Sequence, residues 1–79
     1  MYTPDEKTAK QLENNFKYHK PMEGQPERYT SIRGDAASFA GMLTVFCPPS
    51  RELSLALTKL EECVMWANAA IARNEKSDA

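Results

Sequence analysis

The sequence predicts an all-α fold, in which a short N-terminal helix precedes a long antiparallel helical hairpin that self-associates. Apolar residues recur at steps of three and four along two long stretches, which is the period of one helix face. Prolines and glycines separate these stretches, and both residue types interrupt regular structure. We therefore expect one domain over residues 1–79, with helices at about 4–16, 26–46 and 51–74.

The first helix is expected to begin at a capping sequence. Thr3 can cap it, Pro4 suits the first helical position, and Glu6 completes a capping box. A helix this short and polar is only marginally stable alone, so we expect it either to dock on the rest of the chain or to fray. Its thin apolar stripe consists of Ala9, Leu12 and Phe16.

The second helix is expected to open at Pro26 and to run to about Phe46, because the prolines that follow cannot continue it. Opposite its apolar stripe, small residues recur at helical spacing. They either let another backbone or a flat ligand approach closely or form a small exposed face, and both interpretations stay open. The apolar stripe is Tyr29, Ile32, Ala36, Phe39, Leu43 and Phe46, and the small stripe is Gly34, Ala37, Ser38 and Gly41.

The third helix is expected to follow Ser50, a good capping residue, and it has two adjacent apolar stripes. At about 100° per residue, these stripes together span about half of the helix circumference. One partner helix covers only part of that arc, and the short first helix cannot cover the rest. We therefore expect self-association with closed symmetry. One stripe is Leu53, Leu57, Leu60, Val64, Ala67 and Ile71, and the other is Ala56, Cys63, Trp66 and Ala70.

Composition excludes several classes of protein. A net charge of −1 with 42% hydrophobic and 27% charged residues is typical of a globular domain, and it argues against a partner such as a DNA or RNA polymer. No apolar run approaches the roughly 20 residues that span a bilayer, and no leader sequence follows Met1. We expect a cytoplasmic protein without a membrane partner. Cys47 and Cys63 should lie about 18 Å apart along the helix axis, which is too far for a disulfide. We therefore expect both thiols to be free and buried.

The sequence gives little basis for catalytic or metal chemistry. His19 is the one histidine, and a zinc site needs several clustered ligands. Glu61 and Glu62 are adjacent, so they point about 100° apart on a helix and do not form a dyad. A pair of His19 with Cys47 or Cys63 would lack a third, orienting group. We expect a binding protein rather than an enzyme, with no catalytic residue, metal or cofactor.

Cations and aromatic residues alternate between residues 17 and 33. Lysine and arginine hold phosphate through charge-assisted hydrogen bonds, and flat rings stack bases, so this segment is a candidate nucleotide site. Tyr29 fits the core better, and the lysines also fit a solvated surface. Arg33 needs an anion, either a carboxylate such as Asp35 or Glu61 or a ligand phosphate. The candidate binding residues are Tyr18, His19, Lys20, Arg28 and Arg33.

Arg51 and Thr58 lie two turns apart on one face of the third helix, away from its apolar arc. The dipole of a helix disfavours a cation in the first turn. The position of Arg51 is explained if its side chain and the free amides of that turn face an anion together. The alternative is an exposed arginine that pairs with nothing.

The stretch RELSLALTKLEECVMWANAAIAR, residues 51–73, resembles the second long helix of a phage protein family. The members of this family sequester immune cyclic nucleotides and are known as anti-CBASS and anti-Thoeris sponges. The segments 16–19 and 25–33 are similar in order and spacing to the family's leading segment and first hairpin helix, so the resemblance covers about residues 16–74. It implies an immune-evasion protein of a phage that acts in the host cytoplasm.

The resemblance also implies a ligand and an assembly. Family members are homo-oligomers, hexamers among them, that bind cyclic dinucleotides such as cyclic GMP–AMP between protomers without degrading them, and some bind cyclic trinucleotides or cyclic ADP-ribose variants. Their dinucleotide pocket uses a tyrosine before the first hairpin helix and a basic residue within it, positions that Tyr18 and Arg33 match. Arginine stands here where the best-known member has lysine. Arg51 and Thr58 match polar positions of the long helix and are candidates for a trinucleotide-type site.

Two other functions fit a set of helices. A helical hairpin can bind a protein partner through Trp66 and the small stripe of the second helix. A helix-turn-helix protein that binds DNA is disfavoured by Glu61 and Glu62 and by the lack of basic excess on the third helix.

Overall fold

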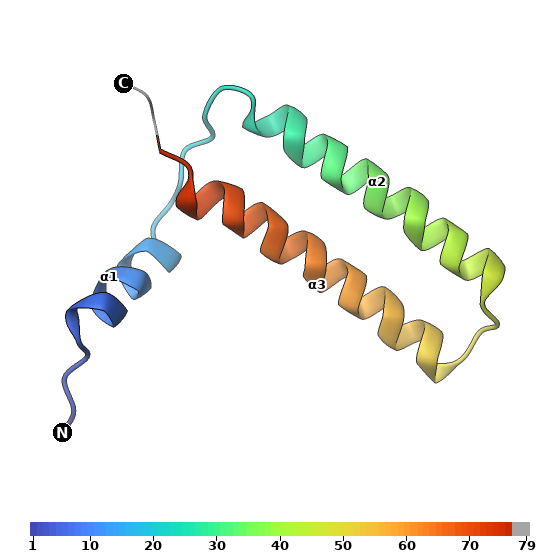
Figure 1. Cartoon of the computed structure of the whole chain (residues 1–79), viewed down its shortest axis with the longest axis horizontal. Helices are drawn as coiled ribbons and strands as arrows, with labels where there is room; N and C mark the ends of the chain where they lie inside the picture. The colour runs from blue at the N-terminus through green and yellow to red at the C-terminus, as the bar shows by residue number, and fades with distance from the viewer. Residues whose placement is uncertain (77–79) are drawn as a thin grey trace.

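The computed structural model describes residues 1–76, which form three helices and no strand. Helix α1 spans Glu6–Asn15, α2 spans Gln25–Phe46 and α3 spans Arg51–Asn74. Figure 1 shows α3 returning alongside α2, and the two helices contact each other. The short helix α1 lies beside the C-terminal end of α3. The predicted all-helical class is confirmed.

The ends of the helices follow from local capping. Ser50 caps α3 as predicted, since its hydroxyl accepts a hydrogen bond of 3.1 Å from the amide of Leu53. The expected start of α1 at Thr3 and Pro4 is wrong. Asp5 is the N-cap instead, and its carboxylate accepts from the amide of Thr8 at 2.7 Å. A carboxylate both caps the free amides and opposes the positive end of the helix dipole.

The contact between α2 and α3 is a single line of half-buried apolar residues. On α3 this line is the first predicted stripe, as expected. On α2 the predicted stripe is only partly covered, because Phe39 is 46% and Phe46 75% exposed. Cys63 was expected to be buried but is exposed, since it belongs to the second stripe of α3, which α2 does not cover. Cys47 is half-buried, and both thiols are free as predicted.

The chain forms one layer of helices without a core of its own. Its shortest dimension is 14 Å, little more than the roughly 10–12 Å diameter of one helix. The accessible surface is 6836 Å², whereas a folded monomer of this size exposes about 4,800 Å². The radius of gyration is 17.0 Å against about 12 Å for a compact domain. Within residues 1–76, no hydrophobic side chain is buried.

A polar clasp joins the start of α2 to the end of α3. We define it as Gln25, Arg28 and Glu75. The guanidinium of Arg28 donates two hydrogen bonds to the Glu75 carboxylate, at 2.5 and 2.6 Å. The side-chain amide of Gln25 donates to the same carboxylate at 2.9 Å. Hydrogen bonds from Arg28 and then from Gln25 lower the pKa of the Glu75 carboxyl from 4.5 to about 2.

We expect acid to release the clasp. Because the pKa of Glu75 is lower in the folded chain, the clasp stabilises the fold fully above about pH 4.5, and this stabilisation is lost as the pH falls through about 2. Thermal unfolding should therefore show a lower Tm for Glu75→Gln than for the wild type at neutral pH, and the difference should vanish near pH 2. Glu62→Gln removes an equal charge at a position within α3 that lies outside the clasp, and it is the control. A Tm difference for Glu75→Gln that does not change with pH would contradict this assignment.

Candidate functional site

Two adjoining hollows lie where α1 and the linker after it meet the C-terminal half of α3. The α1 hollow has a volume of about 630 Å³ and the linker hollow about 500 Å³, both within the range of about 300–1,000 Å³ for small-molecule sites. Asn15, Ala69 and Arg73 line both. The α1 hollow is also lined by Lys7, Lys10, Gln11, Asn14, Trp66, Ala70 and Asn74, and the linker hollow by Lys17, His19, Tyr29, Arg33, Asn68 and Ala72.

Two hydrogen bonds hold α1 at this place. The side-chain amide of Asn14 donates to the backbone carbonyl of Arg73 at 2.9 Å, so α1 docks rather than frays. Nε2 of His19 lies 2.8 Å from the carbonyl oxygen of Asn14. A carbonyl can only accept, so Nε2 carries the proton and donates it, which satisfies a carbonyl at the end of α1.

The two hollows are strongly cationic although the chain has a net charge of −1. Half of the chain's ten lysines and arginines line them, whereas no acidic residue among residues 1–76 does. The one ion pair that reaches them joins Lys10 to Glu6 at 3.0 Å, and both of its side chains are highly exposed. The two hollows together therefore favour an anion. Their cations are Lys7, Lys10, Lys17, Arg33 and Arg73.

Arg33 lacks the carboxylate partner that was one of its two expected anions. Its guanidinium donates only to the hydroxyl of Thr30, at 3.4 Å, and no ion pair within residues 1–76 includes it. Asn68 also lines this hollow, and its Oδ1 atom is buried and accepts no hydrogen bond from the described residues. The linker hollow thus has both a cation and a polar group whose bonding capacity is unused.

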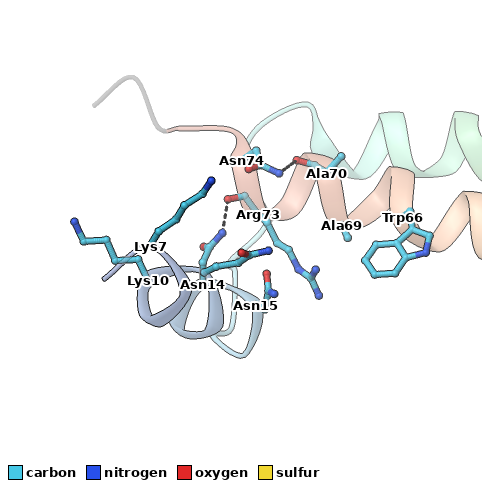
Figure 2. Close-up of a pocket in the computed structure, with 10 residues that line it drawn as sticks. Lys7, Lys10, Asn14, Asn15, Trp66, Ala69, Ala70, Arg73 and Asn74 are labelled. Atoms are coloured by element: carbon cyan, nitrogen blue, oxygen red, sulfur yellow. Dashed lines mark hydrogen bonds between the residues drawn. The ribbon is translucent and has the colours of Figure 1, made fainter. Parts of the chain in front are cut away.

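Flat side chains border both hollows. Tyr29 and His19 line the linker hollow, and Tyr29 is only half-buried against α3. Trp66 lines the α1 hollow and is 55% exposed. Figure 2 shows Arg73 extending its guanidinium between Asn15 and the Trp66 ring. Cations beside accessible rings can hold a flat, negatively charged molecule.

The structure brings together only some of the residues predicted to bind ligand. His19 and Arg33 line the linker hollow. Tyr18 and Lys20 lie on the linker with exposed side chains that do not line it, and Tyr18 is 81% exposed. Arg28 is engaged in the clasp. The remaining two, Arg51 and Thr58, lie in the half of α3 remote from both hollows.

Several residues of the hollows were not singled out from the sequence. Asn68 and Arg73 interrupt the run of small and apolar residues that ends α3, and this interruption was the signal that could have identified them. Lys7 and Lys10 gave no such signal, because their role depends on where α1 docks. Tyr29, assigned to the core, lies half-buried at the edge of the linker hollow instead.

Within residues 1–76, no three histidine, cysteine or acidic side chains lie close enough together to hold a metal ion. None of the three helices in that range combines the length and the apolar character that crossing a bilayer requires. Both hollows therefore depend on cations, amides and aromatic rings for their chemistry.

Comparison with known proteins gives one match. A family model described as Acb2/Tad1, hairpin domain, matches residues 8–72, which confirms the resemblance to the anti-CBASS and anti-Thoeris sponges. No curated protein and no solved structure matches the chain. The matched region includes all three helices over most of their lengths and most residues of both hollows, while Lys7, Arg73 and Asn74 lie outside it.

The docking of α1 can be tested through Trp66, the only tryptophan of the chain. We expect Asn14→Ala to increase acrylamide quenching of its fluorescence, because loss of the bond to the Arg73 carbonyl lets α1 move away from the α1 hollow. Asn74→Ala is the matched control, since Asn74 lines the same hollow but bonds only to Ala70 within its own helix. Equal quenching in the two variants would show that the Asn14 bond does not hold α1.

Proposed function

The chain belongs to the Acb2/Tad1 hairpin family, and from this premise we propose that it binds cyclic nucleotide second messengers of antiphage immunity and sequesters them unchanged. In this proposal the α2–α3 pair is the family's antiparallel hairpin, and the protein acts for a phage in the cytoplasm of the infected cell. The ligands are cyclic dinucleotides such as cyclic GMP–AMP, with cyclic trinucleotides as a further class. Neither a cofactor nor a metal takes part.

The observation that carries this proposal is the concentration of cations at two hollows that no described carboxylate lines. A cyclic dinucleotide presents two phosphates and two flat bases in a compact ring. Arg33 and Arg73 are suited to the phosphates because a guanidinium donates two parallel hydrogen bonds to such an anion. Tyr29 and the exposed Tyr18 offer faces for the bases. Arg33 lacks a carboxylate partner in residues 1–76, which supports a ligand phosphate as its anion.

Sequestration without turnover is supported by the kind of residues at the hollows. Hydrolysis of a phosphodiester requires a nucleophile and groups that transfer protons. His19 lines the linker hollow, and its Nε2 donates to the Asn14 carbonyl. Neither cysteine lines either hollow. Most of the polar residues at the hollows are hydrogen-bond donors to an anion, which supports binding without cleavage.

Arg51 and Thr58 are our candidates for a second site, of the trinucleotide type. Both are exposed and lie near the start of α3. The amides of that turn are free to face an anion together with Arg51, except for the Leu53 amide that Ser50 occupies. Lys20 and Arg28 remain candidates at the edge of the first site.

We also propose that the protein functions as a closed homo-oligomer, with six protomers as in family members. The support is the surface of about 2,000 Å² that the chain exposes beyond the expectation for a compact monomer of its size. That excess is the area of a standard protein interface or more. The uncovered apolar residues of α2 and α3 are Phe39, Met42, Val45, Phe46, Leu55, Met65 and Trp66. A Cβ atom added at Gly34 or Gly41 would meet nothing within 4 Å, so the small stripe of α2 is open to a neighbouring helix.

The binding site is tested by single substitutions and isothermal titration calorimetry with cyclic GMP–AMP. We expect Arg33→Ala and Tyr18→Ala each to weaken binding by about 10- to 100-fold, the equivalent of one hydrogen bond to a charged group or one base stack. Helical content should stay unchanged. Lys59→Ala is the control, because Lys59 is an exposed cation of α3 that pairs with Glu62 outside both hollows. Wild-type affinity in both site variants would refute the site assignment.

The fate of the ligand is read in the same samples. After denaturation of the complex, mass spectrometry should recover cyclic GMP–AMP unmodified, and linear products would contradict sequestration. An intact oligomer that binds no cyclic di- or trinucleotide would favour the alternative function, a hairpin that binds a protein partner.

Self-association is tested by light scattering after size-exclusion chromatography. Phe46→Glu places a charge on the uncovered apolar surface, and we expect it to shift the protein to smaller species, because burial of an unpaired carboxylate in an interface costs several kcal/mol. Tyr2→Glu makes a comparable change at a residue that is 99% exposed and lies before α1, and it should leave the assembly intact. A monomeric wild-type protein would overturn the packing argument.

A further inference from the structure

We propose that the clasp of Gln25, Arg28 and Glu75 is a positioning device that fixes the linker 16–24 as one wall of the linker hollow, and so sets the affinity of that hollow for its ligand. This inference rests on the proposed function. It assigns a role to residues that do not themselves line the hollow.

The linker is attached at both ends to the last turns of α3. Before the linker, Asn14 donates to the carbonyl of Arg73. After it, the side-chain amide of Gln25 donates to Glu75 at 2.9 Å and lies 3.5 Å from the carbonyl of Ile71. The carbonyl of Arg73 lies in the last turn of α3 and is one of those that lack a partner within the helix. The carbonyl of Ile71 also accepts from the backbone amide of Glu75, so the bond from Gln25 is its second. Figure 1 shows the linker passing close to this end of α3.

Between its two attachments, apolar burial does little to hold the linker. Its aromatic side chains point into solvent, since Phe16 is 86% and Tyr18 81% exposed. Met22 is half-buried. Lys17 and His19 are the linker residues that line the hollow. Nε2 of His19 also donates to the carbonyl of Asn14 at 2.8 Å. The position of Lys17 and His19 relative to Arg33 and Arg73 therefore depends on this bond and on the polar attachments at the two ends of the linker.

The buried side chain of Gln25 connects the linker to α3 through both ends of its amide. Its side chain is 2% exposed, and it is the one residue within 1–76 that is buried. The oxygen of its amide accepts from the backbone amide of Met22 at 3.0 Å, while the nitrogen donates to α3. One side chain thus joins the last turn of the linker to the end of α3. Removal of such a buried amide leaves its partners without hydrogen bonds.

The clasp and the hollow share one turn of α3. Ala72 and Arg73 line the linker hollow. On either side of them in the sequence, the carbonyl of Ile71 and the carboxylate of Glu75 accept hydrogen bonds from the Gln25 side chain. Arg28 strengthens the arrangement because it holds the Glu75 carboxylate at both oxygens. Release of the clasp leaves the helices intact and frees the wall formed by Lys17 and His19. The ligand then has to order that wall when it binds, which lowers affinity.

The experiment combines amide hydrogen exchange with calorimetry on the full-length protein. Gln25→Met keeps the side-chain size and removes both polar ends, and Glu75→Gln removes the charge that Arg28 and Gln25 contact. In both variants we expect amides of residues 16–24 to exchange about tenfold faster, a larger increase than in α2 and α3, whose exchange reports only the loss of overall stability. The Kd for cyclic GMP–AMP should rise about tenfold, the equivalent of one hydrogen bond to a charged group. Glu62→Gln is the control of equal charge and should change neither quantity.

The outcomes separate the clasp from the proposed function. Faster exchange in residues 16–24 with wild-type affinity would overturn the positioning role, and so would unchanged exchange in both variants. Uniformly faster exchange over all three helices would reduce the clasp to a contributor to global stability, which also overturns it. If the wild type binds no cyclic nucleotide, the proposed function fails, and the exchange data alone decide whether the clasp fixes the linker.

Discussion

A single layer of helices has two open faces, and this constraint governs the rest of the molecule. With a thickness of 14 Å, the chain lets α2 and α3 meet along one line only, so apolar side chains are at best half-buried within residues 1–76. The hydrophobic effect therefore does not determine where α1 and the linker lie. Polar contacts do so instead, and the apolar surface that α2 and α3 leave uncovered is available for the self-association proposed above.

The polar contacts converge on the last turns of α3 for a physical reason. Throughout its length a helix uses its own carbonyl groups, but at its C-terminal end they are free. Asn14 and Gln25 donate to this end, and Glu75 adds a carboxylate just beyond it. The same turns present Arg73 to both hollows. The attachment of the N-terminal segment and the construction of the cationic site are thus properties of one short stretch of chain.

What was predictable from the sequence was local. The helices of the all-α class follow from apolar periodicity and from prolines, and His19 and Arg33 were identified together because cations and aromatic residues alternate around them. The cap of α1 was misplaced because Thr3 and Asp5 are both good capping residues, and a carboxylate is the stronger of the two at the positive end of a helix. The contributions of Lys7 and Lys10 were not predictable. They depend on where α1 docks, and the hydrogen bond between the Asn14 side chain and the backbone of α3 leaves no periodic pattern in the sequence.

The charge distribution is consistent with the proposed preference for a compact anion over a polymer. Five cations line the two hollows, yet the whole chain has a net charge of −1, so the remainder of its surface is acidic on balance. At physiological ionic strength charges are screened beyond about 8 Å. A small cyclic anion inside the hollows therefore interacts with the cations alone. A nucleic-acid strand would extend past the hollows over acidic surface, which repels each further phosphate. It would therefore lack the many phosphate contacts on which polymer binding depends. Selectivity for small phosphorylated ligands then requires no recognition of sequence, only the confinement of positive charge to a site of about one ligand's volume.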